Sequence, residues 1–430
     1  MTTKSTADHV FVRELNLALV MRLIYEAAPL SRAQVASKTG LNKSTVSSLV
    51  SDLLERHLIH ETGFNSIGAG RPATQLEVNA AAGAVVAVQL GVDFVAAALV
   101  DFVGRVLWRK QIGVGADDSQ QETIRQTRAL VDEAVDLSRK ERLPVLGLSF
   151  AMPGTVDLEK GELIFAPNLK WRDVPFRKIF SMDHVKVYVE NDANAAAVGE
   201  HLFGGAQHVR DFIFVFAGVG LGGGLFLNDR LYRGKGGHAG EIGHTAILAE
   251  PLQQQCQCGN LGCWETYANQ ASIFQRVQKR LDSAPGVQSR IPVLMAERKT
   301  PLSLPIIKQA ADDGDEVARG ALSDAGSALG TGMAGLINIL NPEKIILGGP
   351  VSIAGDYLLP SIRKSAEQRA MPGIVAQTEI NLSAFGPDAS LIGAAAVVID
   401  DILGNPTEVE KEVMDRGALQ AVSARSGSFD

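Results

Sequence analysis

One pattern of strands and glycine turns occurs twice in this chain, about 130 residues apart. In each copy an apolar strand is followed by a turn, a second strand, a further turn and a third strand. The expected strands span residues 84–90, 93–101 and 106–112 in the first copy, and 212–217, 225–227 and 230–232 in the second. In the second copy the glycines at 220–224 are expected to form the first turn. The chain is therefore expected to contain two similar halves, and its 430 residues are enough for two or three domains.

Several segments between and after the two copies agree with an α/β fold. A helix is expected at 121–140 and a buried strand at 145–150. The strand Val187–Asp192 ends in an acid and leads into an alanine-rich helix. A small-residue helix at 326–340 precedes a strand that enters Gly348-Gly349. The architecture that builds two lobes from such a duplication around a cleft is the actin-like (ribonuclease H-like) fold of sugar kinases and heat-shock ATPases, and we expect it here.

The first eighty residues have a different texture and predict a separate domain. The expected helices span 13–28, 31–38 and 43–57, and the expected strands begin at 58 and at 74. The first helix repeats apolar residues at helical spacing: Leu15, Leu19, Leu23 and Ile24. Ser31 and Asn42 precede the second and third helices as expected caps. Three helices followed by a β-hairpin predict a winged helix-turn-helix domain.

These observations give four expected regions. Residues 1–80 form the winged helix-turn-helix domain, and 81–195 form a first lobe to which 380–400 return. Residues 196–379 form a second lobe that carries a metal site, and 401–430 form a polar C-terminal tail.

The small polar side chains at the start of the third helix suit contacts with base edges and phosphates in a major groove. The expected DNA contacts are Ser31, Arg32, Asn42, Lys43, Ser44, Thr45, Ser47, Ser48 and, in the wing, Arg71. Residues 1–80 carry eight Lys and Arg against seven Asp and Glu, whereas the whole chain has a net charge of −7. This balance excludes a protein that coats nucleic acid but permits contact by the head alone. A three-helix interaction module with a polar face is the alternative.

All three cysteines of the chain fall within eight positions, at Cys256, Cys258 and Cys263, and His244 lies twelve residues before the first. Three thiolates and one imidazole make a complete tetrahedral zinc set. A thiol cluster or a redox pair is the alternative, but three cysteines cannot all pair and no signal-peptide pattern is seen, so we expect no disulfide. With four protein ligands, no position stays open for water, so the zinc is expected to be structural.

Three long motifs carry a resemblance to a known family. They are Asn191-Asp192-Ala193-Asn194-Ala195-Ala196, the run from Gly237 to His244, and the Cys-x-Cys-Gly-x-x-Gly-Cys-x-Glu run at 256–265. They resemble the signatures of the ROK family (repressors, open reading frames, kinases). With the expected winged helix in front, the chain is most similar to the ROK transcriptional repressors of the xylose-repressor group, from residue 10 to about 400.

The resemblance implies a sugar-binding set and a vestigial catalytic position. The implied sugar ligands are Gly154, Asn168, Asn191, Asp192, Glu241, His244 and Glu265. Asp192 matches the general base of the kinases. Alternating carboxylates and amides suit sugar hydroxyls, which both donate and accept hydrogen bonds. One nitrogen of His244 is expected on zinc and the other towards the sugar.

The phosphate-binding side departs from the family pattern. Where the kinases have Asp-x-Gly-Gly-Thr-Lys, this chain has Gln89-Leu90-Gly91-Val92-Asp93-Phe94. In the second loop, Val219 replaces a phosphate-contacting Thr. Phosphoryl transfer depends on positioning and on neutralising charge, so we expect no kinase activity. Loops that drift in sequence yet still bind ATP are the alternative.

The sequence therefore predicts a sugar-responsive transcriptional repressor of carbohydrate-utilisation genes. Its effector would be a monosaccharide of the xylose or glucose type, with an N-acetylated hexosamine next, bound without phosphorylation. The expected partner is a palindromic operator read by a homodimer or tetramer. No apolar run approaches the length of a membrane span, so a cytoplasmic location is expected. The alternatives are an active ATP-dependent sugar kinase with a DNA-binding head, and a repressor whose effector is a protein.

Overall fold

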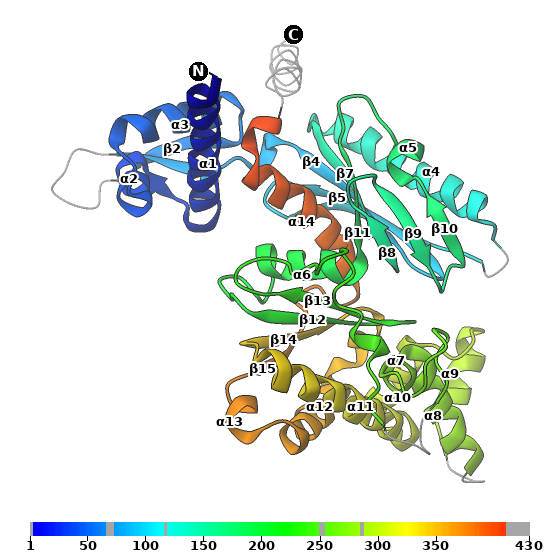
Figure 1. The fold of residues 1–430 in the computed structure, drawn as a ribbon. Coiled ribbons are helices and arrows are strands. Elements are labelled where there is room, and N and C mark those ends of the chain that lie inside the picture. The colour runs from blue at the N-terminus through cyan, green and yellow to red at the C-terminus, as the bar shows by residue number, and fades with distance from the viewer. Residues whose placement is uncertain (1–2, 66–72, 116–117, 249–253, 284–287, 410–430) are drawn as a thin grey trace.

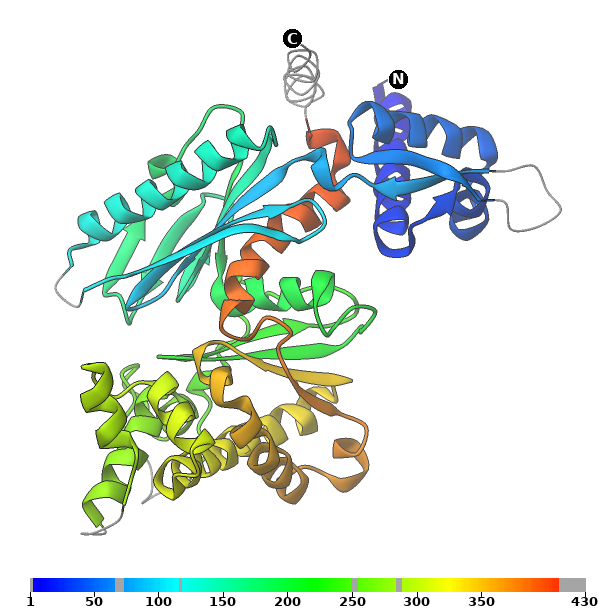
Figure 2. The ribbon, with the colours of Figure 1, turned by 180° about the vertical axis from the view of Figure 1, so that it is seen from behind.

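A computed structural model describes residues 3–65, 73–115, 118–248, 254–283 and 288–409. The ribbon separates into a small head and two lobes, with one long C-terminal helix between them (Figures 1 and 2). The two-lobed body has the expected mixed α/β, sugar-kinase-like architecture. In the part of the chain that the structure describes, no helix combines the length and apolar character needed to cross a bilayer.

The head contains the three expected helices and a three-stranded sheet. The helices are α1 (Thr3–Ala27), α2 (Arg32–Thr39) and α3 (Lys43–Glu55), and the sheet order is β1 (Leu30–Ser31), β3 (Ala73–Val78), β2 (Ile59–Asn65). Ser31 and Asn42 cap α2 and α3 as expected, each accepting a backbone N–H of the first turn. The hairpin β2–β3 follows α3, which is the arrangement of a winged helix-turn-helix domain.

The buried face of α1 differs from the one that the apolar spacing suggested. Leu15 and Leu19 are 54% and 46% exposed. The residues of α1 that reach the core are Leu17, Val20, Met21 and Ile24. Apolar residues occur on both sides of this helix, so spacing alone did not identify the face that α2 and α3 cover.

The upper lobe is built on a five-stranded sheet. Its order is β11 (Val187–Asn191), β7 (Val145–Met152), β4 (Ala84–Leu90), β5 (Phe94–Asp101) and β6 (Val106–Gly113). Helix α4 (Gln120–Lys140) packs on one face, where Leu130 and Ala134 meet Val86 and Val88. A small sheet of β8 (Thr155–Asp157), β9 (Glu162–Ala166) and β10 (Trp171–Val174), followed by α5 (Phe176–Ile179), extends this lobe.

The lower lobe is built on a four-stranded sheet and a group of helices. The sheet order is β13 (Leu221–Phe226), β12 (Phe212–Ala217), β14 (Lys344–Gly348) and β15 (Glu379–Leu382). The helices are α7 (Glu265–Ala268), α8 (Gln270–Ser283), α9 (Ile291–Arg298), α10 (Leu304–Asp312), α11 (Glu316–Leu340), α12 (Gly355–Arg369) and α13 (Pro372–Val375). Figure 1 places them below the sheet, while α6 (Asp192–Phe203) lies above it.

The second copy of the strand pattern differs from the expectation in two places. The glycines at 222–224 belong to β13 rather than to a turn, and residues 230–232 form only an isolated bridge, Phe226 to Leu231. The glycines permit close packing of the helix above them: a Cβ on Gly224 would lie 2.5 Å from the carbonyl oxygen of Ala193 on α6. The glycine run is therefore a contact surface within a strand, which sequence reasoning had interpreted as a loop.

Helix α14 (Ala389–Gly404) joins all three parts of the molecule. It packs on α6, where a Cβ on Gly393 would lie 2.1 Å from the carbonyl oxygen of Ala195. Its middle covers β4 and β7, and its end lies beside α1 of the head. The helix continues beyond residue 401, where the sequence suggested that the tail begins, and the short turn Pro406–Glu408 follows. Residues 410–430 of the expected tail lie outside the described residues.

Candidate functional site

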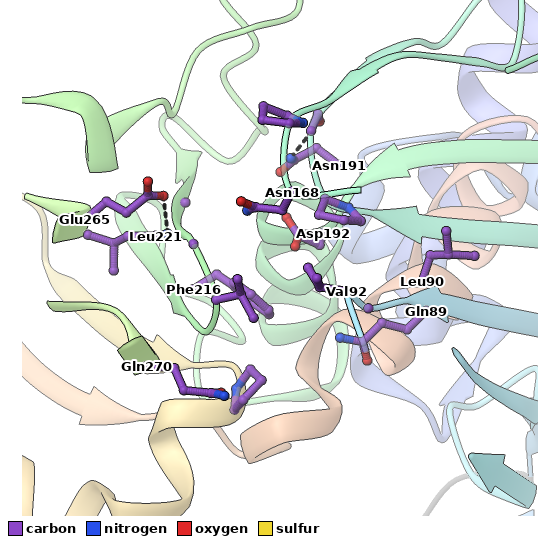
Figure 3. Close-up of a pocket in the computed structure, with 18 of the residues that line it drawn as sticks. Gln89, Leu90, Val92, Asn168, Asn191, Asp192, Phe216, Leu221, Glu265 and Gln270 are labelled. Carbon is purple, nitrogen blue, oxygen red and sulfur yellow. Dashed lines mark hydrogen bonds between the residues drawn. The ribbon is translucent and has the colours of Figure 1, made fainter. Parts of the chain in front are cut away.

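A cleft of about 980 Å³ lies between the two lobes. Both lobes contribute to its wall: strand ends β4, β7 and β11 from above, and the loops after β12 and β13 from below. In Figure 3, Asn168, Asn191 and Asp192 lie on one side of the cleft and Glu265 lies on the other. All seven residues of the implied sugar set line this cleft.

Asn191 is fixed in place by its local hydrogen bonds. Its Oδ1 accepts the backbone N–H groups of Ala193 and Asn194, at 3.0 and 3.2 Å, and so caps α6. Its Nδ2 donates to the carbonyl oxygen of Gly154 at 3.0 Å. Gly154 has φ 120°, and a Cβ there would lie 2.3 Å from the carbonyl oxygen of Phe165. The local backbone therefore requires glycine at this edge of the cleft.

Asp192 is the first residue of α6 and faces the cleft. The pKa of its carboxyl is raised to about 7, chiefly by burial. The hydrogen bond from the backbone N–H of Ala193 lowers this pKa, and the negative charge of Glu241 raises it. Its carbonyl oxygen accepts the Ser390 hydroxyl at 2.9 Å, so the start of α14 holds this residue. The side chain can exchange a proton with a ligand hydroxyl near neutral pH.

Two carboxylates approach from the lower lobe. Oε2 of Glu265 accepts the backbone N–H of Leu221 at 3.0 Å, which fixes the side chain at the start of β13. Glu241 Oε2 lies 3.9 Å from Nε2 of His244. Together with Asp192, these groups give the cleft the acceptors that a polyhydroxylated ligand needs.

The cysteine and histidine ligands converge on one point beside the cleft. The ligand atoms of His244, Cys256, Cys258 and Cys263 all lie within 4.8 Å of one another. Cys256 Sγ is 3.7 Å from His244 Nδ1, and the Sγ atoms of Cys258 and Cys263 are also 3.7 Å apart. A tetrahedral zinc with bonds of about 2.3 Å to sulfur places two sulfurs about 3.8 Å apart. This donor set and its spacing fit a tetrahedral metal ion.

His244 connects this cluster to the cleft. Its Nδ1 faces the thiols, which leaves Nε2 on the side of Glu241. Glu265 is held from the same direction, since its Oε1 lies 3.7 Å from Cys256 Sγ. A metal ion held by these four residues would fix His244 directly and would fix Glu265 through the backbone, since Glu265 follows the ligand Cys263 by two residues.

The segment 89–94, where the sequence predicted a departure from the kinase phosphate loop, lines the same cleft. The Phe94 ring lies over Gly91, where a Cβ would lie 2.3 Å from the ring. Gln89 is 2% exposed, and its Oε1 has no hydrogen-bond partner among the described residues. Across the cleft, Val219 is 36% exposed.

Sequence reasoning missed an ion pair in which only the carboxylate is buried. Arg233 Nη2 lies 2.6 Å from Oε2 of Glu190, whose side chain is 1% exposed. Glu190 directly precedes the Asn191-Asp192 motif, and that position was the only available signal.

On the head, the structure divides the expected DNA contacts into three groups. The side chains of Asn42, Lys43, Ser44, Ser47 and Ser48 are exposed, and those of Thr45 and Arg32 are partly exposed. Arg32 is paired with Glu61 at 3.0 Å. Ser31 is not on the surface, because it is 6% exposed and its hydroxyl caps α2. Arg71 lies outside the described residues.

Two lobes enclose a cleft, and each lobe contributes carboxylate or amide side chains that can hydrogen-bond to sugar hydroxyls. This arrangement defines a protein of the sugar-kinase-like class. Residues 85–401 match the ROK family, and the chain belongs to that family.

Two sequence relatives are named as transcriptional regulators. The chain is 32% identical over 400 residues to a xylose repressor from Caldicellulosiruptor bescii, covering 93% of this chain and 99% of the relative. It is 32% identical over 390 residues to the DNA-binding transcriptional dual regulator NagC of Escherichia coli, covering 90% of this chain and 93% of NagC.

The similar solved structures include both a regulator and a kinase. A ROK transcriptional regulator, a homologue of the E. coli MLC protein, superposes with a TM-score of 0.78 at 28% identity, covering 94% of this chain and 99% of that one. A ROK glucokinase from Streptomyces griseus, solved with glucose and AMPPNP, gives 0.65 at 31% identity, covering 73% and 99%. The regulator's coverage includes the head, whereas the glucokinase covers about the length of the two-lobed body.

Proposed function

We propose that this chain is a sugar-responsive DNA-binding transcriptional repressor of carbohydrate-utilisation genes. The observation that carries the proposal is that all seven implied sugar ligands line one cleft, while the segment 89–94 beside them contains no Lys or Arg. The names of the relatives, xylose repressor and NagC, support the same class.

In this proposal a neutral monosaccharide of the xylose or glucose type binds between the lobes. Gly154, Asn168, Asn191 and Asp192 contact it from above, and Glu241, His244 and Glu265 contact it from below. Because one ligand then bridges two lobes, it stabilises the closed form by its differential affinity. Moving a population from 1:99 to 99:1 requires about 5.5 kcal/mol of that difference.

The three cysteines and His244 would bind a structural zinc ion with no open coordination position. The ion would hold His244 directly and would hold Glu265 through the backbone, since Glu265 lies two residues after Cys263. It supplies no step of a reaction, and its role is to keep the lower wall of the cleft in shape.

On the output side, the head binds operator DNA through the exposed N-terminal part of α3 and through the wing that contains Arg71. Winged helices of two protomers would read palindromic half-sites about 34 Å apart, so a homodimer or tetramer is proposed. The proposed division of the chain keeps the regions 1–80, 81–195 with 380–400, 196–379 and 401–430 in outline. The boundaries at 195, 380 and 401 move to element ends, because α6 and α14 are continuous helices and β15 belongs to the lower sheet.

The proposed test measures operator release. Full-length protein is titrated onto an operator obtained by in vitro selection, with xylose, glucose and N-acetylglucosamine added separately, and the fraction bound is followed by fluorescence anisotropy. Release by one sugar supports the proposal. A coupled assay for ADP, run on the same sample, tests the alternative: turnover near 10 per second, an ordinary enzyme rate, would identify an active sugar kinase instead.

A further inference from the structure

Part of the cleft has no role in the proposed sugar site. Beyond Asp192, Figure 3 shows the apolar side chains of Val92 and Phe216 beside Gln89, and further apolar residues line this part of the cleft. This apolar wall is formed by Val92, Phe94, Val219, Pro350 and Ile353, all of which line the cleft. Val219 and Ile353 are each 36% exposed. These are apolar surfaces that a bound ligand can cover.

The charge of the same wall excludes an anion. The carboxylates that line the cleft are Asp93, Asp192, Glu241, Glu265 and Asp388. Among the described lining residues, Arg109 is the one Lys or Arg side chain, and it is paired with Asp388 at 2.7 Å. A phosphate in this half would meet Asp93 and Asp388 without a free cation to balance it.

Size and continuity point to a ligand larger than one sugar ring. The cleft of about 980 Å³ is continuous from the polar half to the apolar half. Pockets of roughly 300–1,000 Å³ enclose most of the surface of a drug-sized molecule. A single pentose or hexose is smaller than such a molecule and would leave part of this cleft unfilled.

We propose that the apolar half is a second subsite for a ring attached to the effector sugar. The effector class is then an uncharged glycoside, such as a disaccharide or an aryl glycoside. The sugar occupies the polar half, and the attached ring packs on Phe94, Val219 and Ile353. Sugar phosphates and nucleotides are excluded by charge. This inference rests on the proposed function, since it names the ligand of the same cleft.

The test is isothermal titration calorimetry on the full-length protein. The probes are xylose, xylobiose and phenyl β-xyloside in one series, and glucose, cellobiose, phenyl β-glucoside and glucose 6-phosphate in another. In the series whose monosaccharide binds, a glycoside is expected to bind about tenfold more tightly, since covering some 60 Å² of apolar surface gives about that factor. Glucose 6-phosphate is expected to bind at least tenfold more weakly than glucose.

Two variants assign any gain to this wall. Ile353→Asp and Val219→Asp are expected to remove the advantage of the glycoside and to leave the affinity for the monosaccharide unchanged. Leu107→Asp is the matched control, because Leu107 is an exposed apolar residue that does not line the cleft. It is expected to change neither affinity.

The outcomes separate the two proposals. A monosaccharide that binds as tightly as its glycosides, or a phosphate ester that binds more tightly, overturns the second subsite and leaves the proposed function intact. A glycoside advantage that survives in both Asp variants also overturns it. Failure of every probe to bind or to release the operator overturns the proposed function, and the subsite with it.

Discussion

The guanidinium of Arg233 is paired with the carboxylate of Glu190, with Nη2 and Oε2 2.6 Å apart. Glu190 lies at the end of β11 in the upper lobe, and its Oε1 accepts the backbone N–H of Asn191 at 2.9 Å. Arg233 belongs to the loop that follows β13, and its carbonyl oxygen accepts the N–H of Ala239 at 3.1 Å. The pair therefore connects the loop that carries Glu241 to the strand end that carries Asn191 and Asp192.

Replacing Arg233 with Met should leave the buried charge of Glu190 without its partner. We expect a loss of about 1–3 kcal/mol in the free energy of unfolding, below the range for fully buried pairs because Arg233 is one-third exposed. Urea denaturation measures it. Arg210→Met is the control, since its pair with Asp229 is exposed on both sides and should contribute little to stability. Adding Glu190→Gln to Arg233→Met should recover part of the loss. Equal losses of stability in Arg233→Met and Arg210→Met would contradict this account.

The sequence predicts features set by local chemistry better than features set by contacts between distant segments. The caps at Ser31 and Asn42 and the strand Ala84–Leu90 depend on neighbouring residues, and each was predicted. The strand at 221–226 was missed because its glycines are required by α6, which packs on them from another part of the chain. Arg233 and Glu190 share no spacing pattern, so only the folded chain brings them together.

The candidate site shows the same limit. The motifs identified the seven sugar-type residues and the four metal-type residues, which lie together in the structure. They did not indicate that Phe94 covers Gly91, or that Arg109 is neutralised by Asp388. These contacts join residues of different motifs, or residues outside any motif.

Losing the metal should affect the response to sugar more than binding to DNA. In Cys258→Ser, we expect the zinc content to fall from one to near zero per chain and the operator affinity to stay within about threefold. The ratio of operator affinities without and with sugar should fall at least tenfold, because the metal ion no longer holds His244 and Glu265 in place. Metal analysis and anisotropy measure the two effects. A variant that loses operator binding while still responding to sugar would assign the metal to the output side.

The raised pKa of Asp192 predicts a pH dependence of sugar binding. A carboxylate accepts a hydroxyl hydrogen bond more strongly when ionised, so a bound sugar favours the ionised form and binding releases a proton. With a free-protein pKa of about 7, affinity should rise about tenfold between pH 6 and pH 8. Asp192→Asn should abolish this dependence and weaken binding. An unchanged pH profile in Asp192→Asn would show that another group titrates.

The same shift predicts a change in the stability of the sugar-free protein. The pKa is higher in the folded state than its ordinary value of 3.8, so the folded state holds the proton more tightly between these two pH values. The contribution of Asp192 to stability is therefore present at low pH and is lost as pH rises through 7. Thermal unfolding of Asp192→Asn should show a smaller decline over this window than the unchanged protein.

The head should bind DNA through Lys43. This side chain is exposed at the first position of α3. Lys43→Ala should weaken operator binding at low salt and reduce the slope of log affinity against log salt by about one unit, as expected for one lost phosphate contact. Lys140→Ala, an exposed lysine at the end of α4 in the upper lobe, is the control and should change neither quantity. Equal salt slopes in both variants would remove α3 from the proposed interface.

Signal transfer from the cleft to the head should depend on α14. Its first turn holds Asp192 through Ser390, and its last turns hold the head through Asp400, whose Oδ1 lies 2.9 Å from Nη1 of Arg22. Arg56 adds two hydrogen bonds to the carbonyl oxygens of Thr407 and Val409, at 3.1 and 2.8 Å, just beyond the helix. A rigid helix fixed at both ends can convert a small shift at the cleft into a reorientation of the head.

We therefore expect Asp400→Asn to uncouple the two sites without disabling either. The pair is partly exposed on both sides, so the unfolding free energy should change by less than about 1 kcal/mol. Sugar affinity and sugar-free operator affinity should each stay within about twofold. The ratio of operator affinities without and with sugar, which measures the coupling free energy, should fall about tenfold or more. Asp136→Asn, which breaks an exposed pair with Arg139 on α4, should leave that ratio unchanged. If Asp400→Asn keeps the full ratio, the head must receive the signal through a contact other than this end of α14.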